Sequence, residues 1–233
     1  EDELVSSRGG ARTEVPDTLD AQMVVDAKLA LENGSKMQLS YNIENTQRAI
    51  GTRLSSHIVR RFGMTGLREG HILVRLRGSA GQSLGAFTTQ GLRLDVIGDA
   101  NDYVGKGLSG GMIVVRPSAA IGFVASANTI IGNTVLYGAT SGKMFAAGQA
   151  GERLCVRNSG ATAVVEGSGS NACEYMTGGN VVILGEVGDN FGAGMTGGMA
   201  FIYDEAGNFE SRVNRESLQL FRIAHPHWEN KLR

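Results

Sequence analysis

The sequence repeats itself at a fixed spacing, and this self-similarity is its most restrictive feature. When residues 96–115 are placed over residues 183–202, an offset of 87, seven of the twenty pairs are identical, and five of those seven are glycines. Residues 146–156 fit the same frame at an offset of 41, and residues 176–183 at an offset of 68. A unit this short cannot bury an apolar face alone and must stack on its neighbours. The repeat therefore predicts a parallel β-solenoid.

Glycine punctuates the repeat and supplies 34 of the 233 residues. It suits tight turns because it adopts positive φ without steric cost. Turns before successive strands are expected at Gly91, Gly110, Gly151, Gly178 and Gly197. Short strands rich in Val, Ile and Leu are expected over residues 71–76, 92–97, 112–115, 134–137, 153–156, 163–165, 181–184 and 199–203. A further set of residues suits left-handed turn positions and can stack as hydrogen-bonded ladders, namely Asn128, Asn133, Asn158, Asn171, Asn180 and Asn190.

The segments outside the repeat have a different pattern. Mixed helical spacing predicts a helix over residues 20–32, and period-two alternation predicts a strand over residues 36–43. Residues 46–62 fit either a strand or a helix. Near the end of the chain, residues 214–221 are typical of a capped short helix, which would cover an open end of the solenoid.

These patterns predict four parts. Residues 1–17 form a flexible N-terminal linker, residues 18–69 a lead-in segment packed on the solenoid, residues 70–204 a glycine-rich β-helix, and residues 205–233 a C-terminal cap and tail. The expected fold class is mainly β, a right-handed parallel β-helix with an N-terminal helix and strand segment and a short C-terminal capping helix. The right-handedness follows from the crossover rule for parallel strands.

The composition excludes several classes of function. Twenty-two Lys and Arg against twenty-three Asp and Glu give a formal net charge of −1, which offers no bulk attraction to nucleic acid or to an anionic membrane. Two cysteines cannot build a disulfide scaffold, and with four dispersed histidines they match no zinc site. The acidic start and the lack of a run of about 18 apolar residues predict a soluble protein in a reducing compartment. The first residue is not Met, which hints at a longer polypeptide.

Two glycine motifs resemble catalytic or cofactor signatures. GxGxxG occurs at Gly105 and again at Gly192, but a dinucleotide site needs these glycines to open a helix, and here a strand follows each. Ser109 lies in a GxSxG sequence, yet a nucleophile elbow also requires a following helix, and the equivalent position in the repeat is Thr196. We expect both motifs to be structural turns.

Other reactive side chains also favour a structural interpretation. Cys173 has no histidine within fifty residues, so we expect it and Cys155 to be buried thiols. The histidines at 57, 71, 225 and 227 are dispersed, and the last two are expected on a solvated tail. Acidic and basic side chains along the repeat suggest the polysaccharide lyases and hydrolases found on β-helices, although Asp102 and Asp189 recur in register as turn caps would. The charged residues that could form such a site are Asp95, Asp99, Asp102, Glu166, Glu174, Asp189, Arg116, Arg153 and Arg157.

Several longer segments resemble one known family. They are residues 79–87, 98–111, 132–142, 150–161 and 173–179, with a further likeness at residues 45–55. Over roughly residues 18–220, the chain is similar to the C-terminal domain of the large subunit of glutamate synthase. That domain is called GXGXG after glycines spaced GxxGxxxG, which here are Gly185, Gly188 and Gly192.

The resemblance implies a β-helix that has no catalytic, cofactor-binding or metal-binding residues of its own. In the family, this domain packs between a glutaminase (amidotransferase) domain and an FMN-binding synthase barrel and helps to hold the two sites in register around an internal ammonia path. The parent enzyme is an oxidoreductase that makes glutamate from glutamine and 2-oxoglutarate, and it carries FMN and an iron–sulfur cluster in other domains. The implied partners are those two domains, with no nucleic acid and no membrane.

The resemblance leaves alternatives open. A stand-alone polysaccharide lyase or hydrolase is one, and the related β-helix subunit of formylmethanofuran dehydrogenase is another. The family places the protein in the cytoplasm, or in a plastid if the source is a photosynthetic eukaryote. The lead-in segment is longer than an end cap requires, so we also expect an apolar patch that other domains cover.

Overall fold

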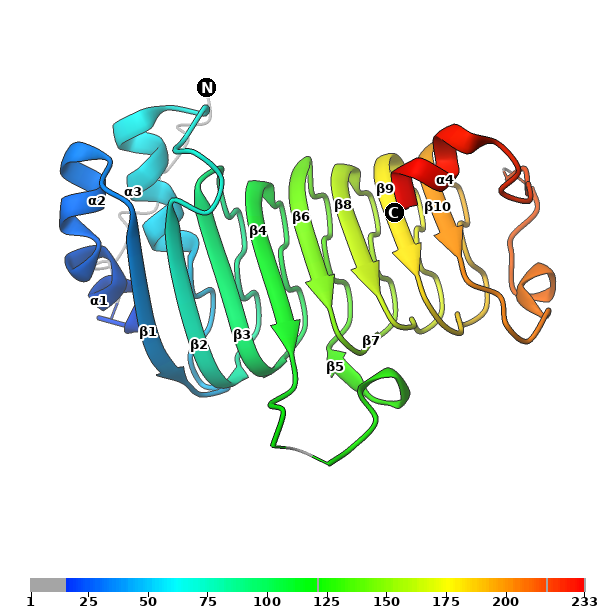
Figure 1. Ribbon diagram of the computed structural model, residues 1–233, viewed down its shortest axis with the longest axis horizontal. Coiled ribbons are helices and arrows are strands. Elements are labelled where there is room, and N and C mark those ends of the chain that lie inside the picture. The colour runs from blue at the N-terminus through cyan, green and yellow to red at the C-terminus, as the bar shows by residue number, and fades with distance from the viewer. Residues whose placement is uncertain (1–15, 121, 217, 233) are drawn as a thin grey trace, which may run out of the picture.

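The computed structural model describes residues 16–120, 122–216 and 218–232. Ten parallel strands form one sheet in the order β1-β2-β3-β4-β6-β8-β9-β10, with the short strands β5 and β7 beside this path. Figure 1 shows the strands side by side in a long row. The strands are β1 Met37–Ile43, β2 Ile72–Ala80, β3 Leu92–Ala100, β4 Ser109–Arg116, β5 Thr129–Ile131, β6 Ser141–Ala146, β7 Gln149–Ala150, β8 Ser159–Val165, β9 Thr177–Ile183 and β10 Gly197–Ile202.

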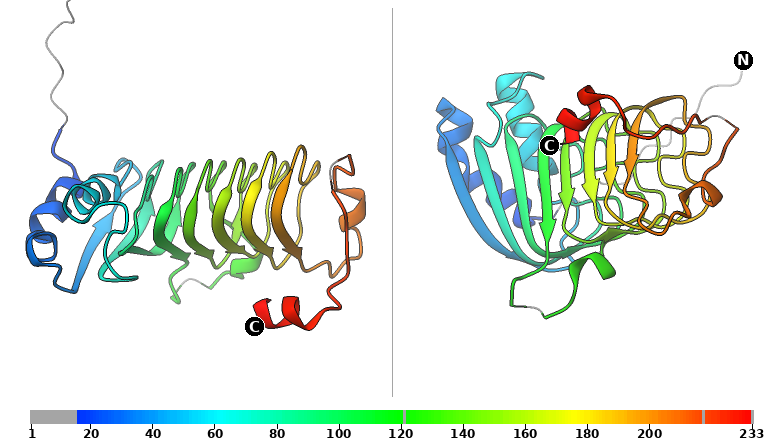
Figure 2. Two further views of the ribbon diagram at one scale, coloured as in Figure 1. Left: turned by 90° about the horizontal axis from the view of Figure 1, so that it is seen from above. Right: turned by 45° about the vertical axis from the view of Figure 1, so that its right-hand side comes forward.

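Helices lie near both ends of the row (Figure 1). Three of them, α1 (Leu19–Asp26), α2 (Lys28–Asn33) and α3 (Thr52–Phe62), stand beside β1. The fourth, α4 (Pro226–Leu232), lies over the sheet near β9 and β10, on the side away from the connecting loops (Figure 2). Among the described residues, none of the helices is long and apolar enough to cross a bilayer.

The N-terminal elements largely follow the sequence. The helix expected over residues 20–32 is confirmed but is divided in two at Ala27, and the strand expected over residues 36–43 is confirmed as β1. The ambiguous stretch 46–62 contains α3. Residues 1–15 of the expected linker lie outside the described residues, and the division of the chain into four parts stays a prediction.

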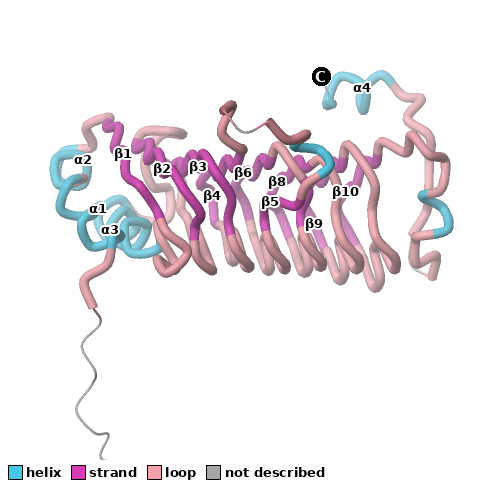
Figure 3. Tube along the Cα trace, turned by 90° about the horizontal axis from the view of Figure 1, so that it is seen from below, coloured by secondary structure: helices cyan, strands magenta, loops and turns pink. Residues whose placement is uncertain are grey.

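Between strands, the chain returns along the opposite side of the molecule. Each return contains a five-residue stretch that we call a return segment, and its first, third and fifth residues have positive φ. Figure 3 shows the connecting loops stacked in a row opposite the strands. The return segments are residues 83–87, 103–107, 134–138, 153–157, 171–175 and 190–194.

Backbone hydrogen bonds join neighbouring return segments in both directions. In the segment 153–157, the middle N–H of Cys155 donates to the carbonyl of Val135 in the preceding segment at 2.8 Å. The first and fifth N–H groups, of Arg153 and Arg157, donate forward to the carbonyls of Ser170 at 2.8 Å and Glu174 at 2.9 Å. The return side is therefore tied together without β geometry, by hydrogen bonds between backbone groups of successive segments.

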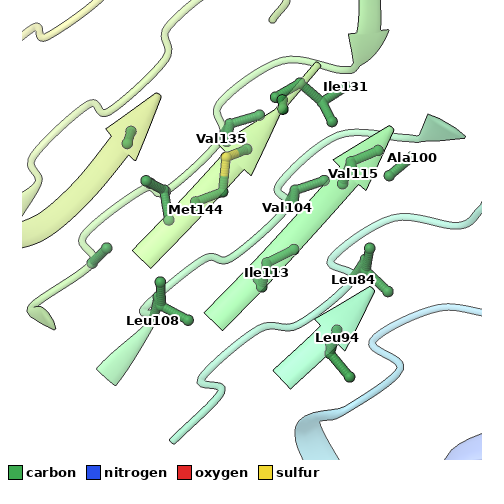
Figure 4. Close-up of a cluster of buried hydrophobic side chains, with 14 of the residues drawn as sticks. Leu84, Leu94, Ala100, Val104, Leu108, Ile113, Val115, Ile131, Val135 and Met144 are labelled. Carbon is green, nitrogen blue, oxygen red and sulfur yellow. The ribbon is translucent and has the colours of Figure 1, made fainter. Parts of the chain in front are cut away.

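The core fills the space between the sheet and the return segments. Leu94, Ile113 and Met144 point inward from the strands and meet Leu84 and Val104 from the return side (Figure 4). All five have side chains that are at most 1% exposed. Stacking therefore buries an apolar interior that no single repeat could bury alone.

The expected fold class, a mainly β protein built as a right-handed parallel β-helix over residues 70–204, is wrong. The strands form a single parallel sheet accompanied by helices, in an α/β-like arrangement. The opposite side of each repeat is not a second sheet, because alternate residues of the return segments have positive φ and strand residues require φ near −120°. The strands expected at 134–137 and 153–156 are wrong for the same reason, since both stretches are return segments.

The strand pairing confirms the offsets of 87 and 68 but not that of 41. The offset of 41 aligned Gly151 with Gly110, but the two glycines are not equivalent. Gly110 lies within β4, whereas Gly151 lies on the return side, where its N–H donates to the Gly132 carbonyl at 3.1 Å. The strand equivalent to β4 is β6, which the sequence pattern missed. One row of paired residues across the sheet contains both confirmed offsets, since Met199 lies 87 residues after Met112 and Asn180 lies 68 residues after it. The members of this row are Met112, Lys143, Thr162, Asn180 and Met199.

Two smaller expectations have mixed outcomes. Asn171 and Asn190 adopt positive φ and form a ladder, in which Asn190 Nδ2 donates to Asn171 Oδ1 at 2.8 Å and Asn214 Nδ2 donates to Asn190 Oδ1 at 3.0 Å. The other four asparagines expected at left-handed turns do not adopt positive φ. The capping helix expected over 214–221 is misplaced, because the described residues of that stretch are turn and loop and the helix is α4.

Candidate functional site

The outer face of the sheet carries a continuous line of apolar side chains, which we call the outer apolar row. Successive residues of a strand point to opposite faces, so the residues between the buried ones face outward. Parallel pairing places one such residue of β4, β6, β8, β9 and β10 beside the next. The row consists of Val114, Phe145, Val164, Val182 and Phe201. The first four are half-buried, although they face away from the core.

Helix α4 covers the end of this row. The ring of Trp228 lies against the ring of Phe201, with centroids 5.8 Å apart and planes at 50°. Phe201 is only 8% exposed, although it faces away from the core. A helix of seven residues is marginal in isolation, so its position depends on contacts such as this one. The outer apolar row therefore already accommodates one helix.

The other half of the same face is polar and charged. The strand pairing continues the outer apolar row from Val114 to the outward-facing residues of β3, β2 and β1, which are Asp95, Arg75 and Ser40. Arg93 Nε pairs with Asp95 Oδ1 at 2.6 Å on β3. Along this line, the outer face thus has a charged part on β1–β3, which we call the polar half, and an apolar part on β4–β10. A contiguous apolar surface beside polar groups is typical of a site that binds another protein surface.

Aromatic rings on the return side explain two of the glycines. A methyl group on Gly107 would lie 2.5 Å from Cδ1 of Phe87, and one on Gly194 would lie 2.5 Å from Cδ1 of Tyr175. Each glycine is the fifth residue of a return segment, and each ring comes from the fifth residue of the preceding segment. The last glycine of each GxG pair therefore gives an aromatic ring of the preceding segment room to pack against the backbone, which we call its platform role. Both GxGxxG stretches lead into strands, as expected for structural turns.

The candidate nucleophiles occupy structural positions. Ser109 is the first residue of β4, and its N–H donates to the Thr88 carbonyl at 3.0 Å. Cys155 and Cys173 are free thiols with no exposed surface. Burial raises the pKa of Cys173 to about 12 and raises the pKa of Cys155 as well. A nucleophilic cysteine needs a lowered pKa, so both thiols are inert in this fold.

The charged residues expected for a lyase site are spread along the molecule, and several of the carboxylates pair elsewhere, whereas Glu166 Oε2 is buried without a hydrogen-bond partner among the described residues. The Asp102 carboxylate accepts the N–H of Asn133 in the next return at 2.8 Å, which is the turn-capping role expected for it. Asp189 instead accepts a hydrogen bond from Arg212 Nη1 at 2.5 Å, and Glu174 pairs with Arg153 at 3.1 Å. Within the described part of the chain, no group of three or more His, Cys, Asp and Glu side chains could hold a metal ion.

The four histidines are not brought together. His57 lies on α3, and the ring of His71, just before β2, contacts the carbonyl of Gly34. His227 lies on α4 with its ring 4.7 Å from that of Trp228, and its N–H donates to Nδ1 of His225 at 3.2 Å. The last two histidines are exposed, as expected, and lie at the start of α4.

The side chains present do not fit the cofactors that the resemblance raises. An iron–sulfur cluster needs several cysteine thiolates, and the two cysteines here are buried with raised pKa values. An FMN phosphate is usually held by N–H groups at a helix N-terminus, whereas the glycine-rich segments here lead into strands and carry aromatic rings. We therefore derive no chemical step through either group in this chain.

Together, the fold and the surface define a repeat domain with stacked, glycine-rich return segments and an apolar sheet face. A family model described as GXGXG motif matches residues 20–233, and the chain belongs to this family. It is 67% identical over 222 residues to the glutamate synthase [NADPH] large chain of Azospirillum brasilense, covering 95% of this chain and 15% of that protein.

Two further relatives have the same kind of coverage. Ferredoxin-dependent glutamate synthase 2 of Synechocystis is 47% identical over 217 residues, covering 92% of this chain and 14% of that protein. Ferredoxin-dependent glutamate synthase 1, chloroplastic/mitochondrial, of Arabidopsis thaliana is 48% identical over 217 residues, covering 93% of this chain and 13% of that protein. The chain thus spans only about one-seventh of the length of the relatives it matches.

Proposed function

We propose that this chain is a non-catalytic scaffold domain of a glutamate synthase, the enzyme that makes glutamate from glutamine and 2-oxoglutarate in ammonia assimilation. Its role is to hold the glutaminase and FMN-binding synthase domains in register. The FMN and the iron–sulfur cluster belong to other domains of the enzyme. The compartment follows the parent enzyme, the cytoplasm or a plastid.

The observation that carries this proposal is the outer apolar row. Four of its five side chains are half-buried on a face that would otherwise meet water, and the fifth packs against α4. A sheet face that only meets water usually alternates polar residues outward. A rigid sheet face that binds neighbouring domains fits a scaffold role, because the stacked repeats hold that face as one surface.

The alternatives gain no support from a specific observation. A calcium-dependent lyase would use clustered carboxylates, whereas the carboxylates along the repeat pair with arginine or with a backbone N–H group at Asp95, Asp102, Glu174 and Asp189. The relatives are glutamate synthases, and nothing in the fold favours a formylmethanofuran dehydrogenase subunit over them.

The proposal is tested by placing a charge in the outer apolar row of the complete large chain. Val164→Glu should lower glutamine-dependent glutamate synthesis by about tenfold, since a carboxylate buried at a domain contact costs well over about 1 kcal/mol. Glutamine hydrolysis and ammonia-dependent synthesis should each be retained, because the active sites lie elsewhere. Thermal unfolding should confirm that the variant is folded.

The matched control is Ser40→Glu, which introduces the same charge on the same face in its polar half. It should leave glutamine-dependent synthesis unchanged. Equal losses in the two variants, or full coupling in Val164→Glu, would contradict the scaffold role of the row.

A further inference from the structure

A groove of about 530 Å³ lies on the three N-terminal helices, away from the outer apolar row. Its apolar lining comes from Val24, Val25 and Leu31 on α1 and α2. Figure 1 shows these helices together at the β1 end of the molecule. Val25 is 66% exposed, so the apolar part of the groove is open to solvent. A small ligand usually binds in a cleft that encloses most of its surface, so this open groove better suits the surface of a protein.

The rim of this groove is mainly basic. Lys28, His57, Arg60 and Arg61 line it, with Glu32 as its acidic member. Lys28 pairs with Glu32 at 3.7 Å, but both side chains are more than half exposed, so the pair exchanges readily for another carboxylate. Within the described residues, Arg60 and Arg61 form no ion pair with a carboxylate. The groove therefore suits a partner that is both acidic and aliphatic.

Hydrogen bonds fix the helices that form this groove. At the start of α3, the N–H of Arg53 donates to the carboxylate of Asp20 on α1 at 2.7 Å. At the other end of α3, Arg61 Nη2 donates to the carbonyl of Glu32 on α2 at 3.0 Å. Leu54, between these two contacts, has no exposed surface. The groove is therefore preformed, and a partner that binds it does not have to order it first.

We propose that the groove binds an acidic, amphipathic helix from another domain of the complete large chain. In this contact, aliphatic side chains three and four residues apart on that helix cover Val24, Val25 and Leu31. Its Asp and Glu side chains pair with Arg60 and Arg61. A helix that lays its apolar face into a groove is a recurring mode of recognition, and the basic rim selects an acidic one. This inference rests on the proposed function, which makes the chain one domain of a larger enzyme.

Two observations favour another domain over a second copy of this chain. The chain spans only about one-seventh of the length of its relatives, so most of such an enzyme lies outside it. Of the α-helices that the structure describes, only α1 carries Asp or Glu without Lys or Arg. Its two carboxylates are engaged, Asp20 by α3 and Asp26 by the Tyr41 hydroxyl group at 2.6 Å. The described part of a second copy therefore offers no free acidic helix.

Zero-length carbodiimide cross-linking tests the contact directly, in the complete large chain. The reagent joins an amine to a carboxylate in direct contact. Every sample carries Glu32→Gln, so that this neighbouring carboxylate does not compete for Lys28. Lys28 should then cross-link to Asp or Glu on one helix of another domain, in peptides identified by mass spectrometry.

Reversing the charge of the rim should weaken this contact. The double substitution Arg60→Glu and Arg61→Glu should lower the yield of the cross-link by about tenfold, because two attractive charges are reversed. Arg60→Glu alone, which leaves the hydrogen bond of Arg61 in place, should lower it by about threefold. Arg116→Glu makes the same change on the exposed residue of β4 and should leave the yield unchanged. Thermal unfolding should show that all variants are folded.

Three results would overturn the proposal. One is a cross-link from Lys28 that is absent or stays within residues 1–233, and another is an unchanged yield in both rim variants. The third is a cross-link that forms only between two copies, in a mixture of isotopically labelled and unlabelled chains. None of these readouts depends on coupled synthesis or on the outer apolar row, so the groove contact and the scaffold role succeed or fail separately.

Discussion

Phe87 and Tyr175 occupy the same place in their repeats, and each covers a glycine of the next return segment. Gly194 has φ +64°, a value that any residue with a Cβ adopts only at a cost. It also has a neighbour in the way, the Tyr175 ring. Gly138 occupies the same fifth position with φ +61° but has open space around its α-carbon. The two glycines therefore share the backbone penalty, and the steric penalty applies to Gly194 alone.

We predict that Gly194→Ala destabilises the fold more than Gly138→Ala does. Gly138→Ala should cost about 1 kcal/mol, from backbone strain alone. Gly194→Ala should cost about 1 kcal/mol more, because the Tyr175 ring must move. Urea unfolding measures both, and adding Tyr175→Ala to Gly194→Ala should cancel the extra cost in a double-mutant cycle. Equal costs for the two glycine substitutions would contradict the platform role.

The buried carboxyl group of Asp20, on α1, makes the stability of the fold depend on pH. It is 3% exposed, and its carboxylate accepts the N–H groups of Arg53 at 2.7 Å and Leu54 at 3.3 Å at the start of α3. Burial raises the pKa of Asp20 above its ordinary value, and these hydrogen bonds oppose that rise only in part. In the pH range above the ordinary carboxyl pKa, the folded state therefore binds more protons than the unfolded state.

The Asp20 carboxyl should consequently stabilise the fold less as pH rises. We predict that the free energy of unfolding of the parent chain, relative to that of Asp20→Asn, falls between about pH 4 and pH 7. Taking the difference removes the titration of all other groups, which the two proteins share. Urea unfolding at several pH values measures it, and a difference that increases with pH would refute the assignment.

Element boundaries and register could be predicted from the sequence only where inward-facing residues repeat. The offsets 87 and 68 were correct because each aligned strand begins with the same glycine turn. Residues 134–137 and 153–156 resemble strands in sequence because both are short aliphatic runs, but their buried residues are consecutive, as at Leu154 and Cys155, where a strand would bury alternate ones. Strand β6 was missed because the pairing from β4 to β6 spans 31 residues, from Met112 to Lys143, which breaks the spacing.

The candidate site was hidden for a related reason. Val164 faces outward and Val165 faces the core, yet both are aliphatic and adjacent in sequence. Only the pairing of strands shows which of them line up across the sheet. The position of α4 was also missed, although Pro226 at the first helical position is a favourable start signal.

At the level of elements, α4 depends on its contact with the sheet. We predict that Trp228→Ala, which removes the ring packed on Phe201, releases α4 from the outer face. Amide hydrogen exchange should accelerate in residues 226–232 and in β10 but hardly change in β2 and β3. Glu229→Gln, on the same helix, is the control and should leave exchange unchanged. Unaltered protection of 226–232 in Trp228→Ala would show that the contact does not hold the helix.

The whole molecule is an elongated sheet whose outer face changes from charged to apolar residues along the line of the outer apolar row (Figure 1). Along the line of the outer apolar row, the charged residues lie near the helices α1 to α3 and the apolar ones run from β4 to β10, with α4 on the last strands (Figure 1). The lead-in segment exposes Val25, Leu29 and Met64, and the apolar patch expected there stays a prediction. The outer apolar row lies elsewhere, on the repeat itself. A scaffold of this shape can contact more than one neighbouring domain along its length.

The central claim is that the outer apolar row is buried against other domains in the complete enzyme, and thiol labelling at Val164→Cys tests it most directly. The native Cys155 and Cys173 are buried, so they should remain silent in the folded protein. We predict that Val164→Cys reacts in the 233-residue chain and reacts at least about tenfold more slowly in the complete large chain. Ser40→Cys, in the polar half of the same face, should react equally in both. Equal labelling of Val164→Cys in the two proteins would contradict the account.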